Sequence, residues 1–450
     1  MKIKVMKFGG TSVATPEARM QAALRVISAK EQGFLPVVVV SAIGRRGQPY
    51  ATDTLIDLLR EIDPAIQPDA REVDLMVACG EIFSSVIFAH TLKSLGHQAM
   101  AFRGGQAGIR TDGNYGNARI VSINPIAIRR SLEKGFIPVV CGFQGNFYPD
   151  PAYPGGELTT LGRGGSDTTG AALGAALKAS AVEIFTDVEG VKTADPDYVR
   201  TAPTLSQVTY EEVAEIAHLG AKVLHPRAAE IAMKYDIPLW VKSTFSQASG
   251  TEIVKQGALP KREVSGITHT GKLVHLMFDL HEASEVHRAA LTAHVFAMMA
   301  KYGINLYMMT LSPSGIGFAV PRGQYPTVEN LIDGLVIPLN GDETQIYMFQ
   351  VGETPSKEAE TQAHLLKGLG RVKTVAIELT EGCTMVSVIG REYLNKAGAF
   401  HRVLSTLYAE NVPVFQTSDS GLSLSCLIPE SELEKAVSIL HDKFVTLEVQ

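Results

Sequence analysis

The run LPVVVVSAI, residues 35–43, constrains the fold most strongly, because it is apolar without interruption and rich in β-branched residues. A strand that is apolar on both faces belongs in a sheet covered on both sides, and such sheets are mostly parallel. Other strand-like runs occur at 2–8, 97–102, 136–143, 181–188 and 237–243. We therefore expect a parallel sheet at the centre of the first part of the chain.

Helical patterns separate most of these runs, over about 15–32, 52–61 and 70–95. Alternating strands and helices predict an α/β fold, a mostly parallel open sheet between two helical layers. The alternation holds to about residue 255. Because 450 residues exceed one ordinary domain, we expect further domains beyond that point.

A different order of elements follows the segment GALPKRE, 257–263, which we interpret as a linker. The sequence 263–280 is typical of an extended strand, 284–302 of a helix, and NLYMMTLS of a second strand. The order strand, helix, strand, strand, helix then recurs near the end of the chain. Two copies of one order predict two small α+β modules.

Charge and cysteine usage exclude several classes of protein. The net charge is −6 without a dense basic block, which argues against nucleic-acid binding. The four cysteines lie far apart, which fits neither a zinc site nor a disulfide scaffold and favours a reducing compartment. No signal peptide is indicated, and the apolar run at 35–43 is shorter than the about 18 residues of a membrane span. We expect a cytoplasmic protein with no membrane or nucleic-acid partner.

The motif KFGGTS, 7–12, places Lys7 at the end of a predicted buried strand, directly before two glycines. Ligands of parallel α/β sheets bind beyond the carboxyl ends of the strands. Glycines there let backbone N–H groups approach a phosphate, and Lys7 supplies a positive charge. A plain strand–turn–helix with a solvated lysine remains the alternative.

The stretch LTTLGRGGSDTTGAALGAALKA, 158–179, contains a second glycine cluster. It is no Walker loop, and Asp167 stands where a GxGxxG motif needs its last glycine. Ser166 and Asp167 lie near the predicted start of a helix, where free N–H groups attract anions. Arg163 offers a planar fork suited to a carboxylate. Capping of an alanine-rich core helix is the alternative.

Three further segments carry polar groups in notable settings. Glu81 interrupts an apolar helix, so it predicts either a buried salt bridge or a site for an ammonium group. IFTDVEGVKTADP, 184–196, leads from a strand into a polar turn, a composition that turns have in any case. LGAKVLHPRAAEIA, 219–232, brings Lys222, His225 and Arg227 near a helix start, where they could bind phosphates or be solvated.

Together these motifs occur in one order: KFGGTS, SAIG, YATDTL, GE-x-x-SS, GFQG, TTLGRGGSDTT, FTDVEGVKTADP and GAKVLHPRA. The set resembles aspartate kinase (aspartokinase), an amino-acid kinase fold followed by paired ACT domains. The resemblance covers about residues 2–255, and the two α+β modules look like the ACT pair. It implies a catalytic domain over 1–256, a first ACT module over 264–375 and a second over 376–450.

The resemblance implies an activity and its partners. The γ-phosphoryl group of ATP would pass to the β-carboxylate of L-aspartate, giving 4-phospho-L-aspartate, the first step toward lysine, threonine, methionine and diaminopimelate. Mg²⁺ would arrive with ATP, with no metal site of the protein's own. Lysine, threonine or diaminopimelate would act as feedback effector through Gln416, Ser418 and Asp419, in a homodimer formed by the ACT modules.

The resemblance also assigns site residues by position. Catalysis falls to Lys7, Arg163 and Asp167. Aspartate binding falls to Ser41, Thr52, Glu81, Phe143, Arg163, Gly164, Gly165 and Ser166. Nucleotide binding falls to Lys7, Phe8, Gly9, Gly10, Thr186, Asp187, Lys192, Thr193, Ala194, Asp195, Pro196 and Lys222. No general base is needed, because a carboxylate nucleophile is already ionised at neutral pH.

Two features depart from the family pattern. Asp197 stands where the family commonly has arginine, so a phosphate contact is lost. About 30 residues, near 313–342, separate NLYMMTLS from QIYMFQVGE, which we expect to be neighbouring strands of an ACT hairpin; we interpret the intervening residues as a folded insertion.

This interpretation has three alternatives. Glutamate 5-kinase and acetylglutamate kinase share the fold but lack both this glycine–arginine loop and paired ACT modules. A non-catalytic amino-acid sensor is the second alternative. The third, fusion to a homoserine dehydrogenase, is excluded by length and by the lack of a GxGxxG motif.

Overall fold

The computed structural model describes residues 2–63, 66–150, 155–221, 223–255, 262–339, 345–352, 366 and 371–445. The chain divides into two compact units. The first contains Met1–Pro196 and Arg200–Ser265, and the second contains Asp197–Val199 and Gly266–Gln450. The interpretation of 257–263 as a linker lies mostly outside the described residues.

The first unit is built on an eight-stranded sheet in the order β10-β12-β11-β9-β1-β2-β6-β3. Its strands are parallel except where β11 meets β12. They are β1 (Ile3–Phe8), β2 (Leu35–Val40), β3 (Ala99–Phe102), β6 (Ile137–Cys141), β9 (Ala181–Thr186), β10 (Gln207–Thr209), β11 (Leu239–Ser243) and β12 (Thr251–Val254). The prediction of a mostly parallel sheet is confirmed.

The first unit also contains a smaller sheet in the order β5-β4-β7-β8. Its strands are β4 (Ile109–Thr111), β5 (Ile120–Ile123), β7 (Gln144–Phe147) and β8 (Glu157–Thr160). The helices of the unit are η1 (Thr11–Val13), α1 (Pro16–Glu31), α2 (Thr52–Ile62), α3 (Ala70–Ser94), α4 (Ile126–Glu133), α5 (Gly165–Leu177), α6 (Tyr210–His218) and α7 (Pro226–Tyr235). The helices predicted over 15–32, 52–61 and 70–95 are therefore present.

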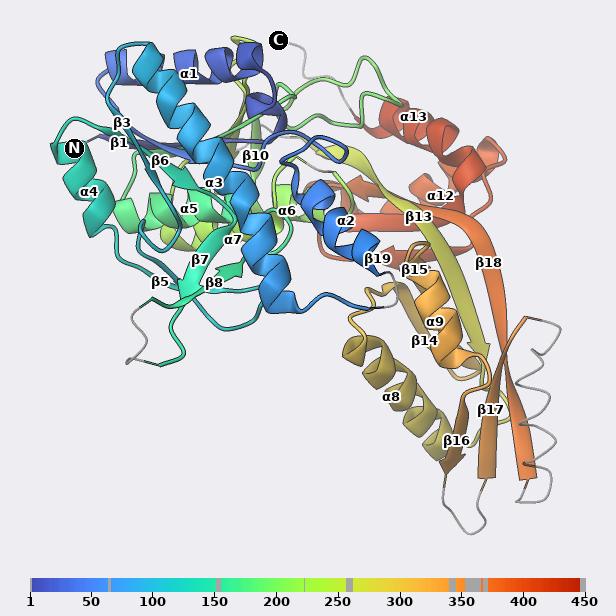
Figure 1. Cartoon of the computed structure of the whole chain (residues 1–450). Coiled ribbons are helices and arrows are strands. Elements are labelled where there is room, and N and C mark those ends of the chain that lie inside the picture. Colours follow the sequence, from blue (N-terminus) through green and yellow to red (C-terminus); the bar gives the residue numbers. More distant parts are fainter. Residues whose placement is uncertain are drawn as a thin grey trace. The chain divides into compact units, whose positions relative to one another are not determined.

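Helices α1 and α3 cover one face of the large sheet (Figure 1). Their apolar residues, such as Val26 and Phe88, form one buried cluster with Phe8 and Val38 of the sheet. On the opposite face α5 approaches closely, because a Cβ at Gly174 would lie 2.3 Å from a methyl carbon of Val182. The alanine and glycine content of α5 is thus explained by its contact with the sheet.

Helix α3 is, within the described part of the chain, the one helix long and apolar enough to cross a membrane. Half of its apolar stretch is buried inside the protein, where it packs against β3 and β6. It also carries the buried carboxylates Asp74 and Glu81. These features identify α3 as a core helix of the first unit.

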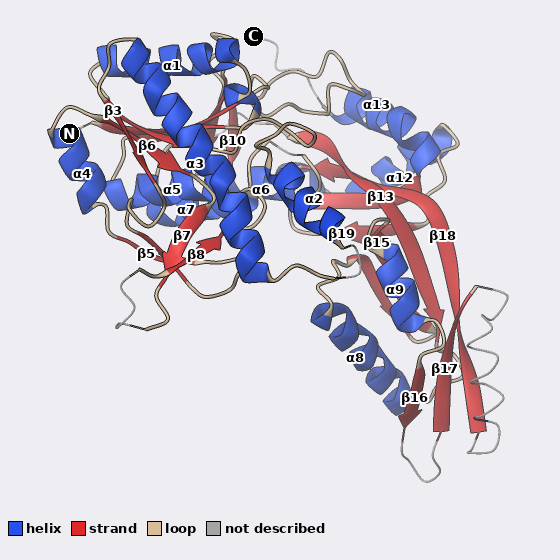
Figure 2. Ribbon diagram, viewed as in Figure 1, coloured by secondary structure: helices blue, strands red, loops and turns tan. Residues whose placement is uncertain are grey.

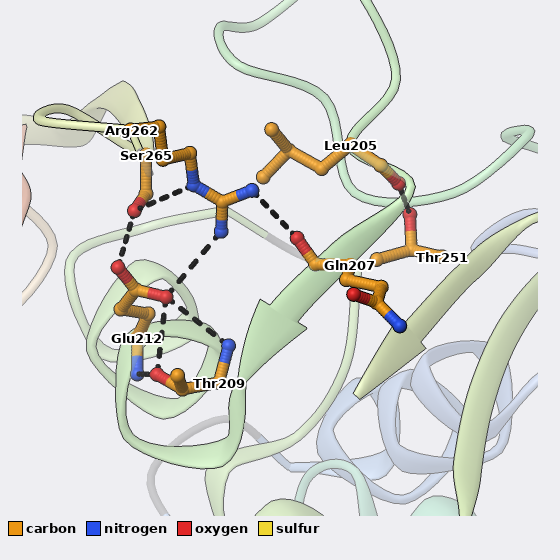
Figure 3. Close-up of polar contacts among 7 residues, drawn as sticks. All are labelled: Leu205, Gln207, Thr209, Glu212, Thr251, Arg262 and Ser265. Carbon is orange, nitrogen blue, oxygen red and sulfur yellow. Dashed lines mark hydrogen bonds and ion pairs between the residues drawn. The ribbon is translucent and has the colours of Figure 1, made fainter. Parts of the chain in front are cut away.

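The last residues of the first unit are anchored to the start of α6 (Figure 3). The guanidinium of Arg262 donates to the Gln207 carbonyl at 2.6 Å and contacts the Glu212 carboxylate at 3.4 Å. The Ser265 hydroxyl donates to the other oxygen of Glu212. Glu212 also accepts from the Thr209 N–H at 3.1 Å, completing a capping box. This cluster fixes the chain where it leaves the first unit.

The second unit repeats one order of elements. The first copy is β13 (Gly266–Asp279), α8 (Glu285–Lys301), β14 (Tyr307–Ser312), β15 (Gly315–Pro321) and α9 (Tyr325–Ile332). The second is β18 (Arg371–Ile389), α12 (Ala399–Ala409), β19 (Gln416–Asp419), β20 (Ser423–Pro429) and α13 (Leu433–Phe444). Further elements are β16 (Val336–Leu339), β17 (Gln345–Val351), α11 (Arg391–Leu394) and η2 (Glu430–Glu432). The predicted repetition is present.

The two longest strands, β13 and β18, run antiparallel through the sheet of this unit (Figure 2). The order is β14-β15-β13-β18-β17-β16, with β19 and β20 added next to β18. The first residues of β13, Gly266–Thr270, pair with the end of β18, which also pairs with β20. The sheet of the second copy, which contains β18 and β20, is therefore extended by the first residues of β13 from the start of the unit. The module boundaries 264–375 and 376–450 stay a prediction.

The expectation that NLYMMTLS and QIYMFQVGE are neighbours is wrong. Strand β14 pairs with β15, whereas β17 pairs with β16 and β18. The residues interpreted as an insertion supply β15, α9 and β16, so they contain the partner strand of the hairpin. Residues 340–342 of that segment lie outside the described residues.

Candidate active site

The carboxyl ends of four adjacent parallel strands meet at one edge of the large sheet. Strands β9, β1, β2 and β6 lie side by side, all running in the same direction. Lys7–Gly10, Ser41, Phe143 and Thr186–Asp187 end or follow these strands. The structure thus brings together residues from motifs far apart in the sequence, as the position of ligands in such sheets leads one to expect.

Lys7 forms an ion pair with Asp167 at this edge, with 2.6 Å between its Nζ and Oδ1. Both side chains are buried. The second oxygen of Asp167 accepts a hydrogen bond from the backbone N–H of His225 at 3.3 Å. Asp167 lies in the first turn of α5, where the helix dipole favours a negative charge. The pair therefore holds the lysine amine at a defined position.

Glu81 projects from α3 into the same region. One of its oxygens accepts from the backbone N–H of Ala42, just after β2, at 2.9 Å. The other oxygen is buried and has no hydrogen-bond partner among the described residues. Burial raises the pKa of Glu81 to about 8, while the Ala42 hydrogen bond and the charge of Lys7 act in the opposite direction. A cation placed at the free oxygen would stabilise the ionised form.

The loop before α5 carries Arg163 and is tightly shaped. Gly164 has a φ of 68°, and a Cβ there would lie 2.1 Å from the His225 ring, so only glycine fits. Arg163 itself is exposed, and no hydrogen bond or ion pair joins its guanidinium to a described residue. Ser166 is buried against Gly142, which precedes Phe143. The Arg163 guanidinium is therefore available to bind a ligand as far as the described residues show, and it lies next to the conformationally restricted backbone of Gly164.

Asp74, which the sequence analysis did not single out, holds this loop in place. It is fully buried on α3 and accepts from the N–H of Gly116 at 3.0 Å. It also accepts from the N–H and hydroxyl of Thr160, at 2.8 and 2.6 Å. Burial raises its pKa, and these hydrogen bonds oppose the rise. Arg227, which the sequence analysis placed near a helix start, also contacts this loop, because it donates to the Leu161 carbonyl at 3.1 Å.

On the side of β9, Asp187 accepts from Thr186 at 3.0 Å and forms a 2.7 Å ion pair with Arg45. The pair joins the loop after β2 to the loop after β9, and both side chains are largely exposed. Arg45 was also missed, because an arginine in a polar loop carries no signal of its partner.

Burial lowers the pKa of His225, and the nearby Asp167 opposes that effect.

The remaining predicted nucleotide residues are only partly brought together. Lys192 donates to the Ala202 carbonyl at 3.3 Å, within the 190–205 segment. Thr193 and Ala194 are buried there, and Asp195 and Pro196 follow them. Thr52 begins α2. Phe8 ends β1 beside Lys7, and Gly9 and Gly10 follow the strand; the Gly9 N–H donates to the Phe185 carbonyl at 3.1 Å. Lys222 lies outside the described residues.

Two predictions concern a metal and an effector. Within the described residues, no group of three or more His, Cys, Asp or Glu side chains is placed to hold a metal ion. Gln416, named as an effector residue, contacts His275 at 2.7 Å and donates to the Met308 carbonyl and the Thr310 hydroxyl. Ser418 and Asp419 continue along β19. Both predictions stay open.

Comparison with known proteins identifies the family of the chain. The model of the amino acid kinase family matches residues 2–243, and an ACT domain model matches residues 378–442. Aspartokinase 1 of Bacillus subtilis (strain 168) is 36% identical over 450 residues, covering 99% of both chains. Aspartokinase of Geobacillus stearothermophilus is 34% identical, covering 99% of this chain and 97% of its own.

A solved structure is similar over the same length. It is E. coli aspartokinase III in complex with aspartate and ADP, in the R-state, with 25% identity and a TM-score of 0.71. The match covers 99% of this chain and 100% of that one. The similarity therefore spans both units of the chain and not the kinase part alone. By its fold, its motifs and its full-length relatives, this chain belongs to the aspartokinases of the amino acid kinase family.

Proposed function

We propose that the chain transfers the γ-phosphoryl group of ATP to the β-carboxylate of L-aspartate, giving 4-phospho-L-aspartate. The observation that carries this proposal is the buried oxygen of Glu81 that has no hydrogen-bond partner among the described residues, in the region of the Lys7–Asp167 ion pair. A buried carboxylate oxygen without a partner is costly, and an ammonium group would satisfy it. The α-ammonium of an amino acid fits this need, and Lys7 lies where a phosphoryl group would meet the substrate.

For this reaction the protein has to position the two substrates and neutralise their negative charges. A carboxylate attacks a phosphoryl group, so two anions approach each other while negative charge spreads over the phosphoryl oxygens. Lys7 stabilises that charge, and Asp167 keeps its amine in place at 2.6 Å. No side chain has to remove a proton, because the attacking carboxylate is ionised at neutral pH.

Three groups hold aspartate in this proposal. Arg163, whose guanidinium has no partner among the described residues, binds a substrate carboxylate, and Glu81 binds the α-ammonium. Gly164 is the N-cap of α5, and Gly165 and Ser166 are its first residues, where the N-terminal N–H groups favour anions. Ser41, Thr52 and Phe143 complete the surroundings of the substrate. Phe143 has a φ of 68°, and its N–H donates to Thr169 at 3.1 Å, which fixes this left-handed position.

ATP is assigned to the neighbouring side, at Gly9, Gly10, Thr186, Asp187 and the segment 192–196. Lys222 belongs to this proposal as a phosphate ligand. Mg²⁺ would arrive with the nucleotide and would draw negative charge from the phosphates when bound. Because Asp197 stands where the family commonly has an arginine, another residue would have to make the phosphate contact of that arginine.

The second unit supports a regulatory role, because ACT modules of the relatives' kind accompany feedback control. E. coli aspartokinase III, 26% identical over 99% of this chain, has been solved in complex with lysine and aspartate in the T-state, with a TM-score of 0.67. We extend the proposal to an effector among lysine, threonine and diaminopimelate. It includes a homodimer through the second unit and a cytoplasmic location, to be tested by light scattering and cell fractionation.

The test is ATP-dependent formation of an acyl hydroxamate in the presence of hydroxylamine. Aspartate should give the product and glutamate should give little, because a longer side chain misplaces its carboxylate relative to Lys7. Turnover of glutamate or acetylglutamate in place of aspartate would point to another kinase of this fold. No turnover with any acidic amino acid would contradict the proposal.

A further inference from the structure

A cavity of about 220 Å³ lies on the first unit between α1 and the strands β1, β9 and β11. Four of the residues that line it are charged: Lys4, Arg25, Lys242 and Glu183. Lys4 and Lys7 are three residues apart on β1, so their side chains point to opposite faces of the sheet. The cavity is therefore separate from the Lys7–Asp167 site, and the proposed phosphoryl transfer uses none of its residues.

Two lysines share one carboxylate oxygen in this cavity. The Nζ atoms of Lys4 and Lys242 lie 3.1 and 2.9 Å from the same Oε1 of Glu183, which is only 5% exposed. Lys4 also lies 4.1 Å from the ring centroid of Phe34, and Lys242 lies 5.0 Å from that of Trp240. One carboxylate can balance one ammonium group. A positive charge is left over in a partly buried place, where it is poorly screened.

Arg25 adds a second uncompensated charge. Its guanidinium donates to the main-chain oxygens of Thr244, at 3.3 Å, and Ser246, and to the side-chain amide of Gln247 at 2.6 Å. All three acceptors are neutral, so they orient the guanidinium without cancelling its charge. Among the described residues that line it, the cavity thus carries three cations and one anion, a surplus of two positive charges.

We propose that this cavity binds a small dianion of the phosphate class, either inorganic phosphate or the phosphate group of a small metabolite. The surplus charge matches a doubly charged oxyanion, and Ser28 and Gln32 add polar side chains to the wall. The volume is several times the about 30 Å³ that a water molecule occupies in the liquid. A polyatomic anion therefore fits without displacing buried apolar side chains.

The test measures binding to the full-length chain by isothermal titration calorimetry. Inorganic phosphate and glycerol 2-phosphate serve as separate probes. Lys242→Gln removes one cation but leaves Glu183 paired with Lys4, so the fold is expected to persist. Lys255→Gln is the matched control, because Lys255 pairs with exposed Asp236 at 2.8 Å and does not line the cavity.

We expect Lys242→Gln to weaken binding by about tenfold or more, as for the loss of a charged hydrogen-bond partner, with the control within about twofold. Any phosphate bound at Lys7 stays unaffected, because that site lies on the other face of the sheet. Tighter binding of the ester would identify a metabolite as the source, and tighter binding of phosphate the free ion; either supports the proposal.

Equal binding by all three proteins, or no binding of either probe to the unmodified chain, would overturn the proposal. If Lys242→Gln fails to fold, Lys4→Met provides the same test, since Glu183 then keeps Lys242. Kinase activity is measured in parallel. Its absence would count against the proposed phosphoryl transfer and would leave the binding result intact.

Discussion

Glu81 illustrates at the scale of one residue how a sequence oddity becomes a chemical assignment. Its position in an apolar helix left open a salt bridge or an ammonium site. In the structure one oxygen is satisfied by Ala42, and the other is buried without a partner among the described residues. No lysine or arginine forms an ion pair with it in the described part of the chain. The ammonium of a substrate is the partner that the proposed function supplies.

The first prediction concerns the pH dependence of stability. The pKa of Glu81 is raised from 4.5 to about 8 in the folded chain, so the folded state favours the neutral form. The contribution of Glu81 to the unfolding free energy is therefore fully present below pH 4.5, its pKa in the unfolded chain, and is lost as the pH rises through about 8, its pKa in the folded chain. Urea unfolding at about pH 6 and pH 8.5 should therefore show a larger loss of unfolding free energy for the unmodified chain than for Glu81→Gln. An equal loss in both proteins would contradict this account of Glu81.

The second prediction concerns the same residue during catalysis. If ionised Glu81 binds the α-ammonium, kcat/KM for aspartate should rise with pH through about 8. Glu81→Gln should lower kcat/KM and abolish this rise, since the amide does not titrate. A variant that keeps the rise would assign the titration to another group. Glu72→Gln, an exposed residue at the start of α3, serves as the control.

The third prediction separates the two substrates. Arg163→Ala should raise the KM for aspartate by about 10- to 100-fold, the effect of losing a charged hydrogen-bond partner, and should change the KM for ATP little. Steady-state kinetics with each substrate varied in turn measure both constants. A rise confined to the KM for ATP would show that Arg163 serves the nucleotide. Arg110→Ala, on the exposed side of β4, is the matched control.

The fourth prediction uses the adjacent arginines 45 and 46. An exposed ion pair contributes at most about 1 kcal/mol, so Arg45 can exchange Asp187 for a phosphate oxygen at little cost. Arg45→Gln should raise the KM for ATP several-fold with little change in Tm. Arg46→Gln, which loses an exposed pair with Asp57 away from β9, should leave both unchanged. Equal KM values for ATP in the two variants would argue against a role for Arg45.

At the scale of elements, Asp74 connects α3 to the loop that carries Arg163. It accepts hydrogen bonds from Gly116 and Thr160, and Thr160 ends β8 three residues before Arg163. Asp74→Asn puts an N–H₂ group against these donors, so we expect a loss of about 1–3 kcal/mol in unfolding free energy and a higher KM for aspartate. Asp69→Asn is the control, because asparagine caps α3 as well as aspartate does. Chemical unfolding and kinetics on both variants test this; equal effects would contradict the role of Asp74.

Much of the element pattern could be read from the sequence, and some of its pairing could not. The continuous apolar run at 35–40 and the alternation around it predicted β2 and its neighbours, because burial on both faces leaves a local signal. The partner of β14 was assigned wrongly, since strand propensity says which segments are extended but not which edge each one joins. Asp74 and Arg45 were missed for a related reason. Their partners, Thr160 and Asp187, lie 86 and 142 residues away in the chain.

At the scale of the whole molecule, each of the two units has its own buried core. The first carries every residue assigned to phosphoryl transfer, and the second carries the repeated modules. The fifth prediction follows. Whichever of lysine, threonine and diaminopimelate inhibits the chain, Asp419→Asn should raise the concentration for half-inhibition without changing kcat. Asp442→Asn on α13 is the control, and unchanged inhibition in both variants would remove Asp419 from the effector site.

The central claim is that the β-carboxylate of aspartate receives the phosphoryl group. It is tested most directly by incubating the full chain with ATP, Mg²⁺ and L-aspartate and reducing the product with borohydride. An acyl phosphate on the β-carboxylate is reduced to homoserine, whereas one on the α-carboxylate gives 3-amino-4-hydroxybutanoate. The account predicts homoserine, formed in an amount that matches the ADP released and lost in Lys7→Ala. Release of ADP without homoserine, or formation of the α-reduced product, would contradict it.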